Sequence, residues 1–224
     1  MLDLNQKTDY DHLNYDQLVL IYKKCQACKL SKYRNHVVVG HGNVPSHIMI
    51  IGEGPGVQED LEGKPFVGRS GQLLVKLLSS VGIDRDKEVY IANTVACRPP
   101  GNRTPHRTEI ETCQHYLLRQ IHIVQPKILL LLGNPSLKMV LGQQFGITKV
   151  RGQWFNQAVT YMTDPLYIMP LFHPAYLLRN ASKNNGSPQW LTRQDLQKVK
   201  DLLMLNSMPS YFTVESQSVE ASPF

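Results

Sequence analysis

Four short runs of apolar residues alternate along this chain with segments that carry leucine or isoleucine at helical spacing. A run of about five apolar residues between polar residues and glycine is typical of a strand that is buried on both faces. The four runs are His47–Gly52, Glu88–Thr94, Lys127–Gly133 and Leu166–Phe172. We therefore predict four buried strands.

The segments between and around these runs predict helices. In residues 70–81 the leucines follow the helical period, with Ser70 as the expected N-cap and Gly82 as the stop. The other expected helices are Asp16–Cys25, Thr108–Val124, Pro135–Leu141, one starting at Pro174 and Pro188–Leu205, and residues 151–162 are expected to form a hairpin. Buried strands that alternate with helices predict an α/β fold, a three-layer α/β/α sandwich around a central, mainly parallel four-stranded sheet.

In folds of this class the functional site lies beyond the carboxyl ends of the strands. Three loops rich in glycine, proline and polar residues follow the expected strands: residues 53–68, 93–105 and 173–179. We therefore place the functional residues on these loops.

Length and composition exclude a collagen, a coiled coil and a wholly disordered chain. The 224 residues predict a single domain over residues 1–205, and the serine-rich residues 206–224 predict a disordered tail. The longest apolar runs are too short to cross a bilayer, and the polar N-terminus is unlike a signal peptide. A soluble cytoplasmic protein without a membrane partner is expected.

The net charge of +6 permits an anionic partner, and its distribution sharpens this expectation. Residues 201–224 contain three acidic residues and no lysine or arginine, so the rest of the chain carries +9. Five arginines lie on or beside the expected site loops: Arg69, Arg98, Arg103, Arg107 and Arg179. A phosphate backbone would fit such a surface.

The four cysteines admit two interpretations. Cys25 and Cys28 have chelate spacing, and Cys97 and Cys113 lie 16 residues apart around a proline-rich loop. In a reducing compartment, four cysteines are not expected to form structural disulfides. They are either unrelated buried thiols or one four-thiolate site for a metal or cluster.

The loop that follows the first expected strand carries carboxylates and an aromatic residue. Its sequence GEGPG contains neither a Walker motif nor the dinucleotide-binding glycine pattern. Glu53 is either a carboxylate that binds water or a cation, or a surface residue without such a role. Glu59 follows it in an acidic cluster. Phe66 is either a core residue or a platform for stacking a base.

Asn93 ends the second expected strand, and His173 follows the fourth. A side-chain amide can pair with a carbonyl beside an N–H, which is the arrangement on one edge of uracil, and it would reject the reverse pattern of cytosine. Otherwise Asn93 caps a turn. His173 is either a buried structural histidine or a donor to an oxygen that becomes negative during a reaction.

These segments together resemble the family 4 uracil-DNA glycosylases, the iron–sulfur type. The similar segments are CQACKLSKYRNHVVVGHG, GEGPGVQEDLEGKPFVGRSGQLL, NTVACRPPGNRTP, RGQWF and LFHPAYLLR, within about residues 18–203. One departure is Ala96, where many members carry lysine, and it puts one phosphate contact in doubt.

The resemblance implies a monomeric enzyme that hydrolyses the N-glycosidic bond of uracil in single- or double-stranded DNA. It implies that Cys25, Cys28, Cys97 and Cys113 bind a structural [4Fe–4S] cluster, although a four-thiolate zinc site remains open. It also implies that Phe66 stacks on the flipped base and that Asn93 reads its edge.

The remaining roles follow from the same resemblance. Glu53 and His173 are the expected catalytic residues, while Gly54 and Glu59 are expected to contact the substrate. Rival hypotheses are a related glycosylase with altered chemistry, a non-catalytic DNA-binding module and a domain detached from a DNA polymerase. One assay separates these hypotheses: a uracil-containing oligonucleotide is treated with the protein, and alkali is then used to test whether the strand breaks.

Overall fold

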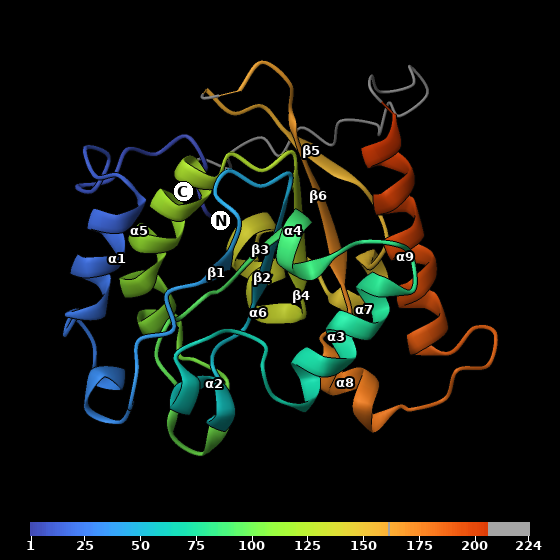
Figure 1. Cartoon of the computed structure of the whole chain (residues 1–224), viewed down its shortest axis with the longest axis horizontal. Helices are drawn as coiled ribbons and strands as arrows, with labels where there is room; N and C mark the ends of the chain where they lie inside the picture. Colours follow the sequence, from blue (N-terminus) through green and yellow to red (C-terminus); the bar gives the residue numbers. More distant parts are fainter. Residues whose placement is uncertain (161, 206–224) are drawn as a thin grey trace.

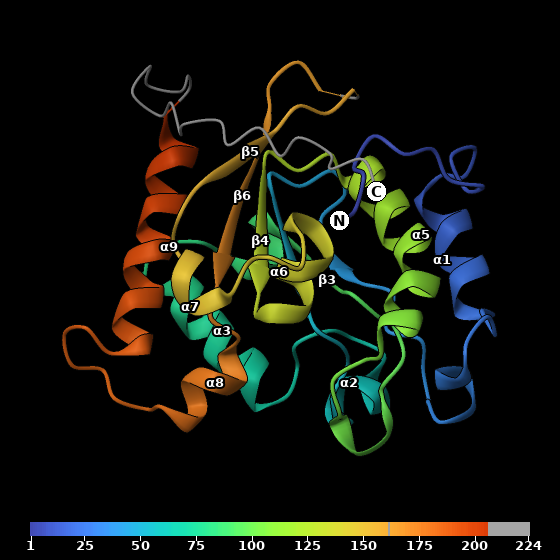
Figure 2. The same cartoon turned by 180° about the vertical axis from the view of Figure 1, so that it is seen from behind.

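The computed structural model describes residues 1–160 and 162–205, and it shows a sheet enclosed between two layers of helices (Figures 1 and 2). The disordered tail expected at residues 206–224 lies outside the described residues. The expected α/β/α class is confirmed.

Four parallel strands form the centre of the sheet. They are β2 (Ile48–Gly52), β3 (Val89–Asn93), β4 (Ile128–Leu132) and β6 (Leu166–Leu171), in the spatial order β3-β2-β4-β6. Nearly all of their residues are buried, which explains why each reads as an apolar run rather than as an alternating pattern.

Two short antiparallel strands extend the sheet to six strands within the described residues, two more than expected. Strand β1 (His41–Gly42) pairs with β3, and β5 (Phe155–Gln157) pairs with β6. The hairpin expected over residues 151–162 was therefore placed too early, because β5 finds its partner in β6. An edge strand of two or three residues is too short to produce a periodic pattern in the sequence.

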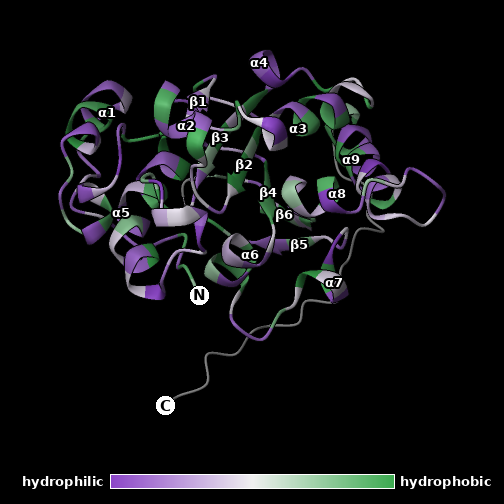
Figure 3. Ribbon diagram, turned by 90° about the horizontal axis from the view of Figure 1, so that it is seen from below, coloured by the Kyte–Doolittle hydropathy of each residue, from purple (hydrophilic) through white to green (hydrophobic). Residues whose placement is uncertain are grey.

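Each face of the sheet is covered by its own helices. One face packs against α3 (Arg69–Ser79), α8 (Pro174–Arg179) and α9 (Pro188–Met204), with Leu78, Leu177 and Leu196 fully buried. The other face packs against α5 (Arg107–Val124) and α6 (Asn134–Leu141). Figure 3 shows the largely hydrophobic strands between these two groups of helices.

Shorter elements complete the described chain. Helix α1 (Tyr15–Lys23) packs against α5, outside the sheet. The others are η1 (Lys29–Lys32), α2 (Val57–Glu62), α4 (Arg85–Glu88), η2 (Pro100–Asn102) and α7 (Ile147–Val150). The expected cap at Ser70 is wrong, because α3 begins at Arg69 and its N-cap is Gly68.

The strand order places a topological switch at β2, since the chain crosses to β3 on one side and β4 lies on the other. Ligands of parallel sheets bind at such a switch, beyond the carboxyl ends of the strands. Helices α2 and α8 follow β2 and β6 there, at the lower edge of the molecule in Figure 1.

Candidate functional site

A cavity of about 430 Å³ lies at the carboxyl edge of the sheet. The loops that follow β2, β3 and β6 line it, as the sequence predicted. Eight of the expected residues lie around this cavity: Glu53, Gly54, Glu59, Phe66, Asn93, Arg103, His173 and Arg179. Arg69 and Arg98 are not among the residues that line it.

The last residue of β2 brings the aromatic ring and the amide together. A β-carbon on Gly52 would lie 2.4 Å from the Asn93 side-chain oxygen and 2.6 Å from Cε2 of Phe66. No side chain fits at this position, so glycine is required by close packing and not only by chain flexibility. Asn93 and Phe66 therefore converge on one point at the base of the cavity.

Asn93 has the clearest mark of a ligand-binding residue. Its side chain is only 5 % exposed, and its Oδ1 is a buried oxygen without a hydrogen-bond partner among the described residues. A buried acceptor without a partner costs about 1–3 kcal/mol. An N–H from a bound molecule would satisfy it. The alternative that Asn93 caps a turn is not supported for this oxygen.

Phe66 is a loop residue in an uncommon conformation. Its φ of 53° lies in the left-handed region, and its ring is 6.0 Å from the ring of His173. A positive φ at a bulky residue is strained and is kept only where surrounding contacts impose it. The ring is nearly buried yet lines the cavity, so a flat molecule in the cavity would meet it.

Glu59 stabilises this loop through backbone contacts. Its carboxylate accepts hydrogen bonds from the backbone N–H groups of Val67 and Gly68, at 2.9 and 2.8 Å, and from Gly56 at 3.1 Å. Three such bonds occupy both carboxylate oxygens. Glu59 thus connects the start and the end of the loop that carries Phe66.

Glu53 differs from Glu59 in having a free carboxylate. The backbone carbonyl of Glu53 accepts a hydrogen bond of 2.5 Å from the Thr94 hydroxyl, which connects the ends of β2 and β3. Its carboxylate has no hydrogen-bond or ion-pair partner within the described part of the chain, and the residue lines the cavity. It is therefore available to water or substrate.

His173 is the N-cap of α8, and its Nδ1 accepts a hydrogen bond of 3.1 Å from the backbone N–H of Ala175. Burial, helped by the positive charge of Arg179 and opposed by Glu59, lowers the pKa of His173 to about 4. The ring is therefore neutral at physiological pH. Because Nδ1 is the acceptor, Nε2 carries the proton and is the donor that remains for a ligand.

The arginines fall into two groups. Arg103 donates to both oxygens of the buried Glu109, at 2.9 and 2.7 Å, and Arg98 donates to the Asn102 side chain at 2.7 Å. The exposed Arg107 pairs with Glu111 at 2.6 Å. Arg69 and Arg179 are exposed and have no ion-pair partner among the described residues, so their charges are free for an anion.

The four cysteines meet outside the sheet, in the apolar cluster between α1 and α5. All four are free thiols, with Cys97 and Cys113 buried. Two further donors point at the sulfurs: Arg34 at 3.2 Å from Sγ of Cys97, and Tyr22 at 3.6 Å from Sγ of Cys113.

The chemistry of these thiols bears on the kind of group they fit. Within the described residues no three histidine, cysteine, aspartate or glutamate side chains are close enough to hold one metal ion. A tetrahedral zinc ion requires four sulfurs at about 2.3 Å from one centre. The four thiols lie in one apolar cluster, and thiolates are ligands both of zinc and of iron–sulfur clusters, so the chemistry of this donor set fits either group.

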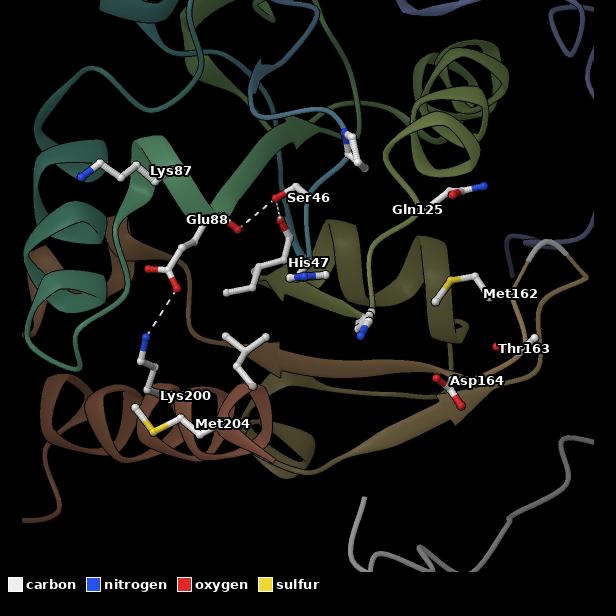
Figure 4. Close-up of a pocket in the computed structure, with 14 residues that line it drawn as sticks. Ser46, His47, Lys87, Glu88, Gln125, Met162, Thr163, Asp164, Lys200 and Met204 are labelled. Atoms are coloured by element: carbon white, nitrogen blue, oxygen red, sulfur yellow. Dashed lines mark hydrogen bonds and ion pairs between the residues drawn. The ribbon is translucent and has the colours of Figure 1, made fainter. Parts of the chain in front are cut away.

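A second cavity, of about 790 Å³, lies at the opposite end of the sheet (Figure 4). Its lining includes His47, Lys127 and Asp164, which precede the strands, and Lys200 of α9. Lys200 pairs with Glu88 at 3.4 Å, and the Ser46 hydroxyl donates to two backbone carbonyls. None of the expected site residues lies there, so its larger volume does not identify the functional site.

Sequence reasoning missed several residues around the first cavity, including Ser70, Pro105 and Tyr176. It also missed Arg85, which lies on α4, outside every loop that was considered. In addition, no helix among the described residues is long and apolar enough to cross a membrane.

Comparisons with known proteins agree with this geometry. The sequence model of the uracil DNA glycosylase superfamily matches residues 39–197. A type-4 uracil-DNA glycosylase of Thermotoga maritima is 44% identical over 185 residues, which cover 81% of this chain and 90% of that protein.

Two further type-4 uracil-DNA glycosylases are similar over most of their length. That of Sulfurisphaera tokodaii is 38% identical over 85% of this chain and 84% of its own length. That of Saccharolobus solfataricus is 40% identical over 85% of this chain and 87% of its own length. This chain belongs to the uracil DNA glycosylase superfamily.

Proposed function

We propose that this chain excises uracil from DNA by hydrolysing the bond between the base and the sugar, which initiates repair of the damaged strand. The observation that carries the proposal is the unpartnered Oδ1 of Asn93 beside the ring of Phe66, at the base of a cavity of about 430 Å³. Uracil supplies both a flat ring and the N–H that this oxygen lacks. Membership of the superfamily supports the same reaction.

Base recognition begins with extrusion. A base inside a duplex is inaccessible, so the enzyme flips the nucleotide out at a cost of a few kcal/mol. The flipped uracil stacks on Phe66. Asn93 Oδ1 accepts the uracil N3–H, and the Asn93 amide donates to the neighbouring O4. Cytosine presents a bare nitrogen at position 3 and an amine at position 4, so both contacts are lost.

Bond cleavage is mainly electrostatic. When the bond between N1 and the sugar carbon breaks, its electron pair moves onto the uracil ring, and the sugar carbon becomes cationic. His173 donates from Nε2 to the uracil oxygen that becomes negative, and backbone N–H groups near Gly54 can add to this. Water attacks the sugar carbon and becomes the hydroxyl of the abasic sugar, and the proton that it loses balances the charge of the released uracil anion. Glu53 orients this water and favours the cationic sugar.

The free arginines support a contact with the DNA backbone. Arg69 and Arg179 flank the cavity from α3 and α8, whereas Arg98 and Arg103 first have to exchange their partners Asn102 and Glu109. Phosphate contacts release counterions, so affinity for DNA is expected to fall steeply with salt. An affinity for DNA that does not change with salt concentration would contradict this placement of the arginines.

The reaction is tested with an oligonucleotide that contains one uracil. Treatment with the protein is expected to create a site at which alkali breaks the strand, while the same oligonucleotide with thymine stays intact. Strand breakage without alkali, or none with it, would contradict the proposed reaction.

The two carboxylates are expected to respond differently to the same substitution. Glu53→Gln removes the charge of the free carboxylate and is expected to slow single-turnover uracil release by about 10²-fold. Glu59→Gln keeps one acceptor oxygen for the loop, so we expect a smaller loss. A Glu53→Gln variant at the wild-type rate would show that another group orients the water.

We further propose that the four cysteines hold a [4Fe–4S] cluster. The convergence of the four thiols in one apolar cluster and the N–H of Arg34 at Cys97 support this assignment. The cluster would connect the segment after α1 to the loop after β3 and to α5, which is a structural contribution. No step of the reaction requires it.

The cluster predicts a brown protein with absorbance near 400 nm and about four irons per chain. Cys113→Ser is expected to lower the iron content and the melting temperature together, because it removes one ligand from the core. A colourless protein with one zinc per chain would contradict the cluster, whatever its activity.

A further inference from the structure

The segment Pro65–Gly68, which carries Phe66, is fixed by two side chains of opposite charge from different helices. Arg85 of α4 donates from its two terminal nitrogens to the backbone carbonyls of Pro65 and Phe66, each at 2.6 Å. Glu59 of α2 accepts from the next two backbone N–H groups. Four consecutive residues therefore each give one backbone group to this pair of side chains.

The conformation of Phe66 explains why the segment requires such contacts. With φ at 53°, the residue is strained, and it would relax to a negative φ if the loop were free. The carbonyl of Phe66 also packs against Gly71 of α3, where a β-carbon would lie only 1.8 Å from this oxygen. A rotation of this peptide would turn the ring away from the cavity.

Arg85 is suited to this contact by its shape. The guanidinium is a planar fork, and it can donate to two successive carbonyls at once, whereas a lysine ammonium has no such fixed geometry. Its Nε is buried and has no hydrogen-bond partner among the described residues, so the two carbonyls are what fix the group. No ion pair of Arg85 competes for it within the described part of the chain.

We infer that Arg85 is a positioning residue for uracil excision, which imposes the left-handed conformation of Phe66 and so orients the ring that stacks on the base. This inference rests on the proposed stacking role of Phe66. Arg85 does not touch the base in this arrangement, and it acts only through Phe66.

The inference is tested by a double-mutant cycle on the full chain as purified. Arg85→Gln is expected to reduce the single-turnover rate of uracil release by about 10- to 100-fold, and Arg85→Lys by less. Affinity for an oligonucleotide without uracil is expected to change less than about twofold. Lys87→Gln, an exposed change on the same helix, is the matched control and is expected to keep the wild-type rate.

The decisive variant is Arg85→Gln combined with Phe66→Ala. If Arg85 acts through the ring, the double variant is as slow as Phe66→Ala alone. If the two losses multiply, or if Arg85→Gln keeps the wild-type rate, the inference is wrong. Melting temperatures of all variants show that the assay temperature lies below unfolding. A wild-type protein that releases no uracil would instead contradict the proposed function.

Discussion

Replacing Asn93 with alanine is expected to lower the single-turnover rate of uracil release by about 10²–10³-fold without lowering stability. The loss arises because the uracil N3–H and O4 then have no partner in a buried site. Stability is expected to stay within about 2 °C in melting temperature, because the substitution removes an acceptor that has no partner among the described residues.

This combination separates a binding residue from a structural one. An Asn93 that only caps a turn would lose stability and keep most of its rate. Asn93→Asp keeps the shape but places an acceptor opposite O4, so it is also expected to be slow. Asn184→Ala, in the exposed loop before α9, is the matched control and is expected to behave as wild type.

His173→Ala is expected to reduce the rate of the chemical step by about 10²–10³-fold, with little change in DNA affinity. The reason is that Nε2 donates to an oxygen whose negative charge develops only as the bond breaks. Single-turnover rates at saturating enzyme measure the chemical step, and binding to an oligonucleotide without uracil measures the affinity for DNA. Equal losses in rate and in DNA affinity would contradict this role.

The pKa of His173 gives the prediction a second readout. With a pKa of about 4 in the folded protein, His173 stays neutral from neutral pH down to about pH 5. Its contribution to the wild-type rate is therefore expected to be constant over this range. An ordinary histidine would change protonation near pH 6.5. Since the unfolded chain binds this proton first, the stability contributed by the neutral ring is lost as pH falls from about 6.5 to 4.

The sheet and the position of the site were predictable because both depend on local patterns. The apolar runs identify strands buried on two faces, and parallel topology then brings their carboxyl ends together. Glu53, Asn93 and His173 were found in this way, from their places at or just after the ends of strands. The edge strands β1 and β5 were not, because two or three residues carry no periodic signal.

The parts that sequence could not predict depend on long-range contacts. Arg85 lies on a four-residue helix and contacts backbone carbonyls, which every residue has, so no pattern indicates it. The pairing of Arg103 with Glu109 gives an expected phosphate ligand a partner within the protein. The cysteine spacing indicated a shared site, but the packing that brings the four cysteines into one apolar cluster is a long-range contact.

The most direct test of the account is a crystal structure of the protein with the products of the reaction, uracil and DNA with an abasic site. We expect the uracil ring to stack on Phe66, with N3 within hydrogen-bond distance of Asn93 Oδ1 and one oxygen facing Nε2 of His173. Uracil bound in the cavity at the opposite end of the sheet, or in the first cavity without a contact to Asn93, would contradict it.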